Sequence, residues 1–329
     1  MKTGLETLVL PAGRAAAEAA ARTLAAGGLV AFPTETVYGL GADAANATAV
    51  AHIYSAKGRP AFNPLIAHVA DLAAARRIGR FDARALQLAE AFWPGPLTLV
   101  VPKTVDCPVS DLATAGLDTV AIRIPAHPVG EAILRAFGGA VVAPSANISG
   151  HVSPTLAAHV EGDLAGRIDL IVDGGPVTVG VESTIVGCFE APMLLRPGGL
   201  SRERIEAVLG TPLARPVVEA ESDDSQPLAP GMLASHYAPR ATVRLRVQEV
   251  APDEALLAFG PDRLPGQEAA AAVMNLSPTA NLDEAAANLF GYLRTLDAKS
   301  PRAIAVMTIP EEGLGEAIND RLRRAAVAR

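Results

Sequence analysis

The sequence is poor in several residue types, and each shortage narrows the class of protein. Its 329 residues include 2 cysteines and 1 tryptophan, and aromatic residues make up 4% of the chain. Cys107 and Cys188 are too few for a disulfide framework or a cysteine-based zinc site. The sequence contains no uncharged apolar run of the ~18 residues that a membrane-spanning helix needs. Met1 to Glu6 contain no apolar stretch of a secretory signal. We therefore expect a cytosolic protein that needs no membrane.

Familiar catalytic and nucleotide-binding motifs are missing as well. The sequence contains no G-x-x-x-x-G-K-[ST], G-x-G-x-x-G, H-E-x-x-H, C-x-x-C or G-x-S-x-G. The segment 39–44 (Gly-Leu-Gly-Ala-Asp-Ala) suggests a dinucleotide loop but lacks the third glycine. The histidines show no metal-ligand spacing, so we predict no metal held by the protein alone, and a structural role for His52, His127, His151 and His159. Any nucleotide site must be built in another way.

Positive charge is also scarce. The chain has 28 basic and 35 acidic residues, a net charge of −7, whereas a protein that binds nucleic acid through phosphates is usually basic. The clearest basic cluster, Arg321, Arg323 and Arg324, is typical of an ordinary helix end, where cations suit the helix dipole. Only 4 of the 28 basic residues are lysines, which draws attention to Lys57.

The distribution of apolar residues predicts two α/β units. Residues 1–212 alternate short β and α patterns, which indicates a twisted mixed sheet with flanking helices. Strands are expected at 29–32, 65–69, 97–101, 120–124, 140–143, 170–172, 183–186 and 194–195, and helices at 14–24, 46–56, 82–92, 128–137 and 201–209. Residues 241–329 form a smaller Rossmann-like α/β domain, with strands at 242–248, 272–276 and 303–308 and helices at 282–297 and 314–328. The chain between them, 213–240, is rich in proline and polar residues and reads as a linker.

Cationic side chains next to a glycine mark the first candidate site. Lys57 and Arg59 flank Gly58 in a stretch that Pro60 and Pro64 keep from being helical, directly before a strand. Arg59 can bind phosphate or carboxylate oxygens through two hydrogen bonds, and Lys57 supplies a compact charge. The alternative is a solvated basic turn.

Further polar residues follow the other expected strands. Small hydroxyl and amide side chains at 145–149 can bind an anion or a sugar, or simply cap turns. Arg196 ends a strand before a tight turn, and Gly180–Thr184 opens another. Arg123 lies inside an apolar strand and therefore needs an anionic partner, either a structural carboxylate or a ligand. His68 lies in a strand too, where a histidine is more often a core residue than a functional one.

Together these residues are strand-end polar groups of one domain. They comprise three arginines, one lysine and several hydroxyls, without a paired nucleophile and base. This set suits a site that holds a polyphosphate beside a small carboxylate and works by positioning and charge stabilisation.

The same residues carry a resemblance to a known family. Pro33–Gly41, Lys57–Pro60 with Asn63–Leu65, Trp93–Thr98, Ala121–Pro125, Ala143–Asn147, Gly180–Thr184 and Leu195–Gly198 resemble, in order, the motifs of the YrdC-like, threonylcarbamoyl-AMP synthase family. The match spans about residues 10 to 210. The segments Pro230–Met232 and His236–Pro239, with the small domain after them, look like the long two-domain branch.

The resemblance implies a reaction. L-Threonine, bicarbonate and ATP give L-threonylcarbamoyladenylate and pyrophosphate, with Mg²⁺ accompanying ATP and no organic prosthetic group. A separate tRNA threonylcarbamoyl transferase would use the product to modify adenosine 37 of tRNAs that read ANN codons. The acidic chain itself is expected to bind tRNA weakly or not at all.

The resemblance also implies roles for particular residues. L-Threonine would be held by Thr34, His68, Arg123, Ala143 and Ser183. ATP would be held by Lys57, Arg59, Asn63, Thr119, Ser145, Ser153, Arg196, Ala234 and Tyr237, with Lys57 and Arg59 as the catalytic cations. Related two-domain proteins often carry an aromatic residue at the position of Ala234, so a contact is lost there. We expect the linker still to close over the site through its backbone or Tyr237.

Two other functions compete with the synthase. One is a non-catalytic module that binds double-stranded RNA or tRNA, which the net charge of −7 and the few aromatic residues disfavour. The other is a carbamoyl-transfer enzyme resembling hydrogenase-maturation proteins. Their acylphosphatase-like and zinc-finger segments are absent from this sequence.

Overall fold

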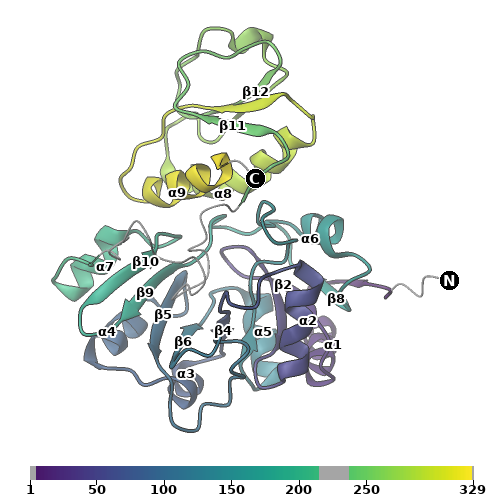
Figure 1. The fold of residues 1–329 in the computed structure, drawn as a ribbon, viewed down its shortest axis with the longest axis vertical. Helices are drawn as coiled ribbons and strands as arrows, with labels where there is room; N and C mark the ends of the chain where they lie inside the picture. Colours follow the sequence, from purple (N-terminus) through teal and green to yellow (C-terminus); the bar gives the residue numbers. More distant parts are fainter. Residues whose placement is uncertain (1–4, 215–236, 328–329) are drawn as a thin grey trace.

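The computed structural model describes residues 5–214 and 237–327, which form a large and a small α/β domain stacked on each other (Figure 1). Residues 215–236 of the predicted linker 213–240, Ala234 among them, lie outside the described residues. Among the described helices, none is long and apolar enough to span a membrane.

A ten-stranded mixed sheet organises the large domain. Its strand order is β1-β8-β2-β3-β7-β4-β6-β5-β9-β10. The strands are β1 (Leu8–Pro11), β2 (Val30–Pro33), β3 (Tyr38–Asp43), β4 (Ile66–His68), β5 (Leu97–Pro102), β6 (Thr119–Arg123), β7 (Val141–Val142), β8 (Leu170–Asp173), β9 (Thr184–Cys188) and β10 (Pro192–Arg196). Parallel pairs such as β4 with β6 alternate with antiparallel pairs such as β5 with β6. The predicted mixed sheet is confirmed.

Helices cover both faces of this sheet. They are α1 (Arg14–Ala25), α2 (Ala47–Lys57), α3 (Leu72–Ile78), α4 (Ala83–Phe92), α5 (Pro128–Phe137), α6 (Ala157–Leu164) and α7 (Arg202–Leu209). The main core packs α2, α3 and α4 against one face. A second cluster packs α1 and α5 against the strands β2 and β8 on the other face. A smaller apolar cluster on β4, β5, β6, β9 and β10 adjoins the site described below.

The small domain is a four-stranded parallel sheet with both α-helices on one face. The order is β11-β14-β12-β13, with β11 (Thr242–Leu245), β12 (Glu254–Ala258), β13 (Ala272–Asn275) and β14 (Ala303–Val306). Helices α8 (Leu282–Asp297) and α9 (Gly315–Ala326) share one hydrophobic core with these strands. They lie between the small sheet and the large domain (Figure 1).

The core of the small domain continues into the large domain. Val37, Val152 and Val181 of the large domain belong to the same buried cluster as the inner faces of α8 and α9. Because this contact is apolar and buried, the hydrophobic effect holds the two domains together.

The structure corrects several expectations about the elements. Strands β1, β3 and β12, helices α3 and α6, and a short 3₁₀ helix at Gln267–Ala269 were not predicted. Lys57 is not in a non-helical stretch, because it is the last residue of α2. Asn46 caps the start of this helix by accepting hydrogen bonds from two backbone amides, and Gly58 ends it in the left-handed region at φ +60°.

Candidate active site

A cavity lies on the second face of the large sheet, where several predicted site residues meet. Its lining consists of Thr36, Val37, Arg59, Leu65, Ile66, His68, Arg123, Ala143, Pro144, Ser145, Glu182, Ser183, Arg196 and Tyr237. Three of these side chains are arginines and one is a carboxylate, so the cavity suits an anionic ligand.

Strand register places His68 beside Arg123. The parallel pair β4 and β6 aligns Ile66 with Ala121 and His68 with Arg123. Since alternate residues of a strand point to opposite faces, Ile66, His68 and Arg123 all lie on the same side of the sheet. These two short strands therefore supply both an apolar floor and two polar groups.

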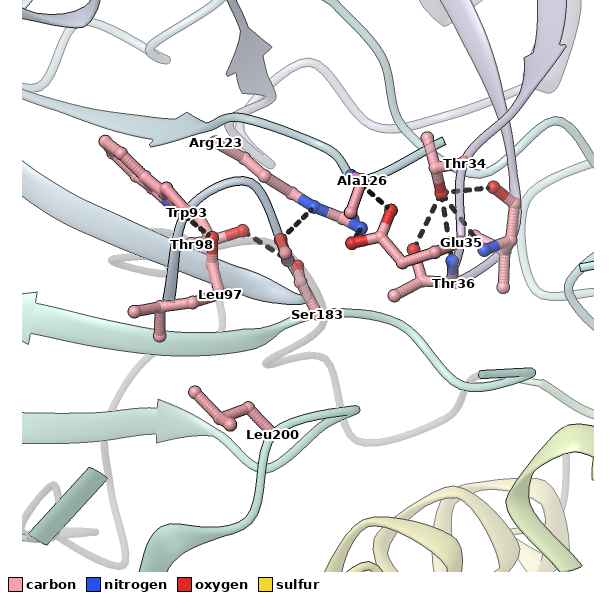
Figure 2. A network of polar contacts seen from close by, with 12 residues as sticks. Thr34, Glu35, Thr36, Trp93, Leu97, Thr98, Arg123, Ala126, Ser183 and Leu200 are labelled. Atoms are coloured by element: carbon pink, nitrogen blue, oxygen red, sulfur yellow. Dashed lines mark hydrogen bonds and ion pairs between the residues drawn. The ribbon is translucent and has the colours of Figure 1, made fainter. Parts of the chain in front are cut away.

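Arg123 has a structural anionic partner, Glu35. Its Nη2 lies 2.7 Å from Glu35 Oε1, and both side chains are buried. Glu35 Oε2 also accepts a hydrogen bond from the amide of Ala126, and Arg123 Nε donates to the carbonyl of Gly95 (3.3 Å). Figure 2 shows the Arg123 guanidinium facing the Glu35 carboxylate, with Ala126 on the far side of that carboxylate. Of the two partners that the sequence left open for Arg123, the structure supplies the carboxylate, which sequence reasoning did not identify as Glu35.

Thr34 is buried behind the cavity wall. Its Oγ1 donates to the carbonyl of Val37 and lies 2.8 Å from Thr36 Oγ1 (Figure 2). Thr36 and Val37 line the cavity, whereas Thr34 does not. Thr34 thus orders the turn that presents Thr36, a cavity residue that was not predicted.

His68 is a neutral imidazole. Burial, followed by the positive charge of Arg123, lowers its pKa to about 3. Its Nδ1 lies 3.1 Å from the carbonyl of Ile66. Because a carbonyl can only accept, Nδ1 carries the proton and Nε2 keeps its lone pair. His68 can therefore accept a hydrogen bond from a ligand.

Ser183 joins two further elements at the cavity. Its Oγ lies 2.7 Å from Thr98 Oγ1 on β5. Arg196, at the end of β10, donates to the Ser183 carbonyl through Nη2 (2.8 Å) and Nε (3.2 Å). Gly198 permits this approach, because a Cβ there would lie 2.3 Å from the carbonyl oxygen of Glu182.

Lys57 holds a loop of the cavity wall. Its Nζ donates to the carbonyls of Ser145 and Asn147, both at 2.5 Å, and the side chain is 1% exposed. Burial and the charge of Arg59 lower its pKa well below the usual value. The solvated basic turn is therefore wrong for Lys57. It lies outside the cavity lining, whereas Arg59 and Ser145 belong to it.

Glu182 is a second functional candidate that sequence reasoning passed over. Its Oε1 accepts a hydrogen bond from buried Ser153 (2.5 Å), and its Oε2 accepts one from Arg321 (2.8 Å). Burial alone would raise the pKa of Glu182, but the charges of Arg321 and Arg196 and these hydrogen bonds lower it to about 2. Its position between Gly180 and Ser183 was the available signal.

The structure separates the predicted residues into two groups. The cavity lining contains Arg59, His68, Arg123, Ala143, Ser145, Ser183, Arg196 and Tyr237. Thr34, Lys57, Asn63, Thr119 and Ser153 are outside the lining. Of these, Thr34, Lys57, Asn63 and Ser153 are buried, while Thr119 is partly exposed at the start of β6.

The basic cluster near the C-terminus also divides. Arg323 and Arg324 form ion pairs with Glu311 and Asp320, as expected for a helix end. Arg321 is fully buried and reaches the large domain. The expectation of an ordinary helix end is wrong for this one residue, because the neighbouring domain covers it.

Fold and cavity together define a class of protein, a YrdC-like α/β domain with an arginine-lined site and a second α/β domain packed beside it. Residues 22–198 match the family model of the Sua5, YciO and YrdC proteins, described as "Telomere recombination". Residues 200–327 match the model of the threonylcarbamoyl-AMP synthase C-terminal domain. The chain belongs to the threonylcarbamoyl-AMP synthase family.

Named relatives agree with this assignment. A threonylcarbamoyl-AMP synthase of Bacillus subtilis is 44% identical over 92% of this chain and 90% of its own length. One of Pyrococcus abyssi is 44% identical over 91% of each chain. The crystal structure of P. abyssi Sua5 complexed with L-threonine superimposes with a TM-score of 0.88 over 97% of this chain and 98% of that one, at 39% identity. The resemblance stated from the motifs is confirmed, and the chain is an enzyme of the nucleotidyltransferase class.

Proposed function

We propose that the chain makes L-threonylcarbamoyladenylate and pyrophosphate from L-threonine, bicarbonate and ATP. The observation that carries the proposal is the presence, in one cavity, of Arg123 beside neutral His68 and of the separate pair Arg59 and Arg196. One arginine suits an amino-acid carboxylate, and the other two suit a polyphosphate. The L-threonine complex of P. abyssi Sua5 supports the first half of this assignment.

L-Threonine occupies the half of the cavity around Arg123. The guanidinium binds its carboxylate, and Glu35 keeps the guanidinium in place from behind. His68 Nε2, the Ser183 hydroxyl and the backbone of Ala143 accept or donate hydrogen bonds to the amine and the side-chain hydroxyl. Thr34 contributes through Thr36, whose position it fixes.

ATP occupies the half of the cavity around Arg59 and Arg196. Both guanidinium groups and the Ser145 hydroxyl bind phosphate oxygens, and Tyr237 closes this side. Lys57 lies outside the cavity and holds the loop of Ser145 through its backbone carbonyl. Asn63 lies beside Arg59 at the turn after α2. Ser153 donates to Glu182 and orients its carboxylate. Thr119 and Ala234 complete the proposed ATP set by family resemblance.

The reaction proceeds by positioning and charge stabilisation. The threonine amine takes up bicarbonate and releases water, which gives a carbamate. A carbamate oxygen then forms a bond to the α-phosphorus of ATP, and the bond to pyrophosphate breaks. Arg59 and Arg196 stabilise the charge that builds on the phosphates. We assign no general base, because the carbamate is already anionic and His68, with a pKa of about 3, is a poor proton acceptor.

Mg²⁺ enters with ATP. Among the described residues, no group of three or more His, Cys, Asp or Glu could hold a metal. Glu182 is the one carboxylate among the described residues of the lining, and Ser153 and Arg321 each donate a hydrogen bond to one of its oxygens. The ion would therefore take its ligands from phosphate oxygens and water, as Mg²⁺ commonly does, and would neutralise the departing pyrophosphate.

The product serves a later step in tRNA modification. We propose that the enzyme works in the cytoplasm, binds tRNA weakly or not at all, and passes the adenylate to a separate tRNA threonylcarbamoyl transferase. The net charge of −7 supports weak tRNA binding.

Mass spectrometry of the product tests the proposed reaction. The protein is incubated with MgATP, L-threonine and ¹³C-bicarbonate. We expect an adenylate that carries one ¹³C together with the mass of threonine. An adenylate without ¹³C, or ADP as the only nucleotide product, contradicts the proposal.

A further inference from the structure

Arg321 links the small domain to the active site. It lies in α9, and its side chain is 0% exposed although it is charged. Its Nε donates to Glu182 Oε2 (2.8 Å), and its Nη1 donates to the carbonyl of Pro197 (2.9 Å) and to Asp320 Oδ2 (2.7 Å). Its guanidinium carbon lies 5.3 Å from the centre of the Tyr237 ring, a cation–π distance.

Each contact of Arg321 with the large domain reaches a segment that carries ATP-site residues. Glu182 accepts the hydroxyl of Ser153, and Pro197 follows Arg196 directly. Tyr237 lines the cavity together with Glu182 and Arg196. One side chain therefore touches the three parts of the structure that surround the proposed phosphate region.

The contact between Arg321 and Glu182 is electrostatic as well as steric. Glu182 and Arg196 are both buried, and the positive charge of Arg321 contributes to keeping Glu182 ionised. Without Arg321, Arg196 would be the remaining cation that lowers the pKa of Glu182. A buried carboxylate that loses one cation draws the other one toward it, and Arg196 would then be displaced from its place in the cavity lining.

Helix α8 of the small domain also packs closely against the residues on either side of this contact. Gly180 packs against α8, where a Cβ would lie 2.3 Å from the carbonyl oxygen of Ala286. Tyr237 stacks on Phe290 of the same helix, with ring centres 5.5 Å apart. The small domain thus fixes both sides of the segment that Arg321 reaches.

We propose that Arg321 is a positioning residue for the ATP half of the site, and that the small domain completes this half through it. The inference depends on the proposed function for the assignment of that half to ATP. Threonine binding depends much less on Arg321, because Arg123 is held by Glu35, and Ser183 contacts Thr98, within the large domain.

A second ion pair of the same helix provides a matched control. Glu316 of α9 pairs with Arg202 of α7 at 2.6 Å, with both side chains mostly buried. This pair also crosses between the domains, but neither residue belongs to the cavity lining. Glu316→Gln therefore weakens a contact between the domains at a residue outside the cavity lining.

The test measures binding of a non-hydrolysable ATP analogue and of L-threonine by calorimetry, with urea unfolding alongside. We expect Arg321→Met to weaken analogue binding by about tenfold or more and threonine binding by less than about threefold. Arg321→Lys keeps the charge but loses the forked geometry, so it falls between Met and wild type. Glu316→Gln leaves both affinities within about twofold of wild type. Unchanged analogue binding in Arg321→Met, or an equal loss for both ligands, overturns the positioning role.

A double variant keeps the test valid if Arg321→Met fails to fold. Glu182→Gln combined with Arg321→Met removes both buried charges and so avoids an unpaired carboxylate. It should unfold near the wild-type urea concentration and still bind the analogue weakly, because the contacts with Pro197 and Tyr237 are lost. Wild-type analogue binding in this folded variant overturns the inference. Failure of the wild-type protein to bind either ligand instead contradicts the proposed function.

Discussion

Glu35 and Arg123, 88 positions apart in the sequence, form a buried ion pair with 2.7 Å between Glu35 Oε1 and Arg123 Nη2. Glu35 has no place in the cavity lining, whereas Arg123 does. The carboxylate therefore neutralises the guanidinium from behind and leaves the part of it that lines the cavity for a ligand. A buried charge pair of this kind costs stability when one member is removed.

Glu35→Gln tests this arrangement. The amide keeps the size of the side chain but not its charge, so Arg123 loses its neutralising partner. We expect the free energy of unfolding to fall by about 3 kcal/mol and the KM for threonine to rise by about tenfold, with the KM for ATP nearly unchanged. Steady-state kinetics and urea unfolding measure these effects. Glu131→Gln, which removes an exposed ion pair with Arg135, is the control and should change stability by less than about 0.5 kcal/mol. Equal rises in both KM values would argue against a role specific to threonine.

Lys57→Met tests the loop-holding role of this lysine. The variant leaves the carbonyls of Ser145 and Asn147 without their donor, which should cost about 2 kcal/mol of stability. The displaced loop should lower kcat/KM for ATP by about tenfold or more. Lys103→Met is the matched control, because Lys103 pairs with exposed Asp111 outside the cavity lining. Full activity in a stable Lys57→Met protein would exclude this role.

The lowered pKa values of His68 and His159 predict a stability loss in mild acid. The pKa of His68 is about 3 in the folded protein, mainly because of burial, against an ordinary value of 6.5. As pH falls below 6.5, the unfolded chain binds a proton that the native imidazole does not. His68 therefore destabilises the fold by about 1.4 kcal/mol per pH unit there. Burial gives His159 a pKa of about 4 and the same sign.

Urea unfolding at pH 7, 6 and 5 measures this dependence. His68→Asn should be less sensitive to acid than wild type by about one proton's slope between pH 6 and 5. His159→Asn should show a reduction in the same direction. An unchanged slope in His68→Asn would mean that the imidazole titrates normally in the native state.

Gly198→Ala tests the contact between the turn after β10 and the segment of Ser183. A Cβ at residue 198 would lie 2.4 Å from both the Ser183 carbonyl carbon and the Thr184 nitrogen. The backbone must move apart, which separates Arg196 from Ser183, so we expect activity to fall by about a hundredfold. Gly162→Ala in α6 is the control, because nothing lies within 4 Å of that position and alanine favours a helix. A fully active Gly198→Ala enzyme would contradict the required close approach.

Apolar patterns predicted most of the strands but missed the short apolar strands β1 and β12, and glycine concealed β3. Strand β3 contains Gly39 and Gly41, residues that rarely favour strands. The structure shows why Gly41 is there, because a Cβ would lie 2.8 Å from the ring of Phe32 on the neighbouring strand. Such a need depends on packing between strands and leaves no local pattern.

Part of the site was predictable from local motifs, and part of it depends on contacts between distant segments. Motifs identified the arginines and hydroxyls at strand ends, and the structure places Arg59, Arg123 and Arg196 in one cavity. Partners from distant parts of the chain were not predictable. Glu35 pairs with Arg123, and Arg321 reaches Glu182 from another domain. A single sequence shows each charge but not which charges meet after folding.

Pyrophosphate release from MgATP, with threonine and bicarbonate each omitted in turn, tests the central claim most directly. The account predicts release that requires both co-substrates and falls by about a hundredfold in Arg59→Ala, since this guanidinium stabilises the phosphates in the transition state. Release from ATP alone, or release that persists at the wild-type rate in Arg59→Ala, would contradict it.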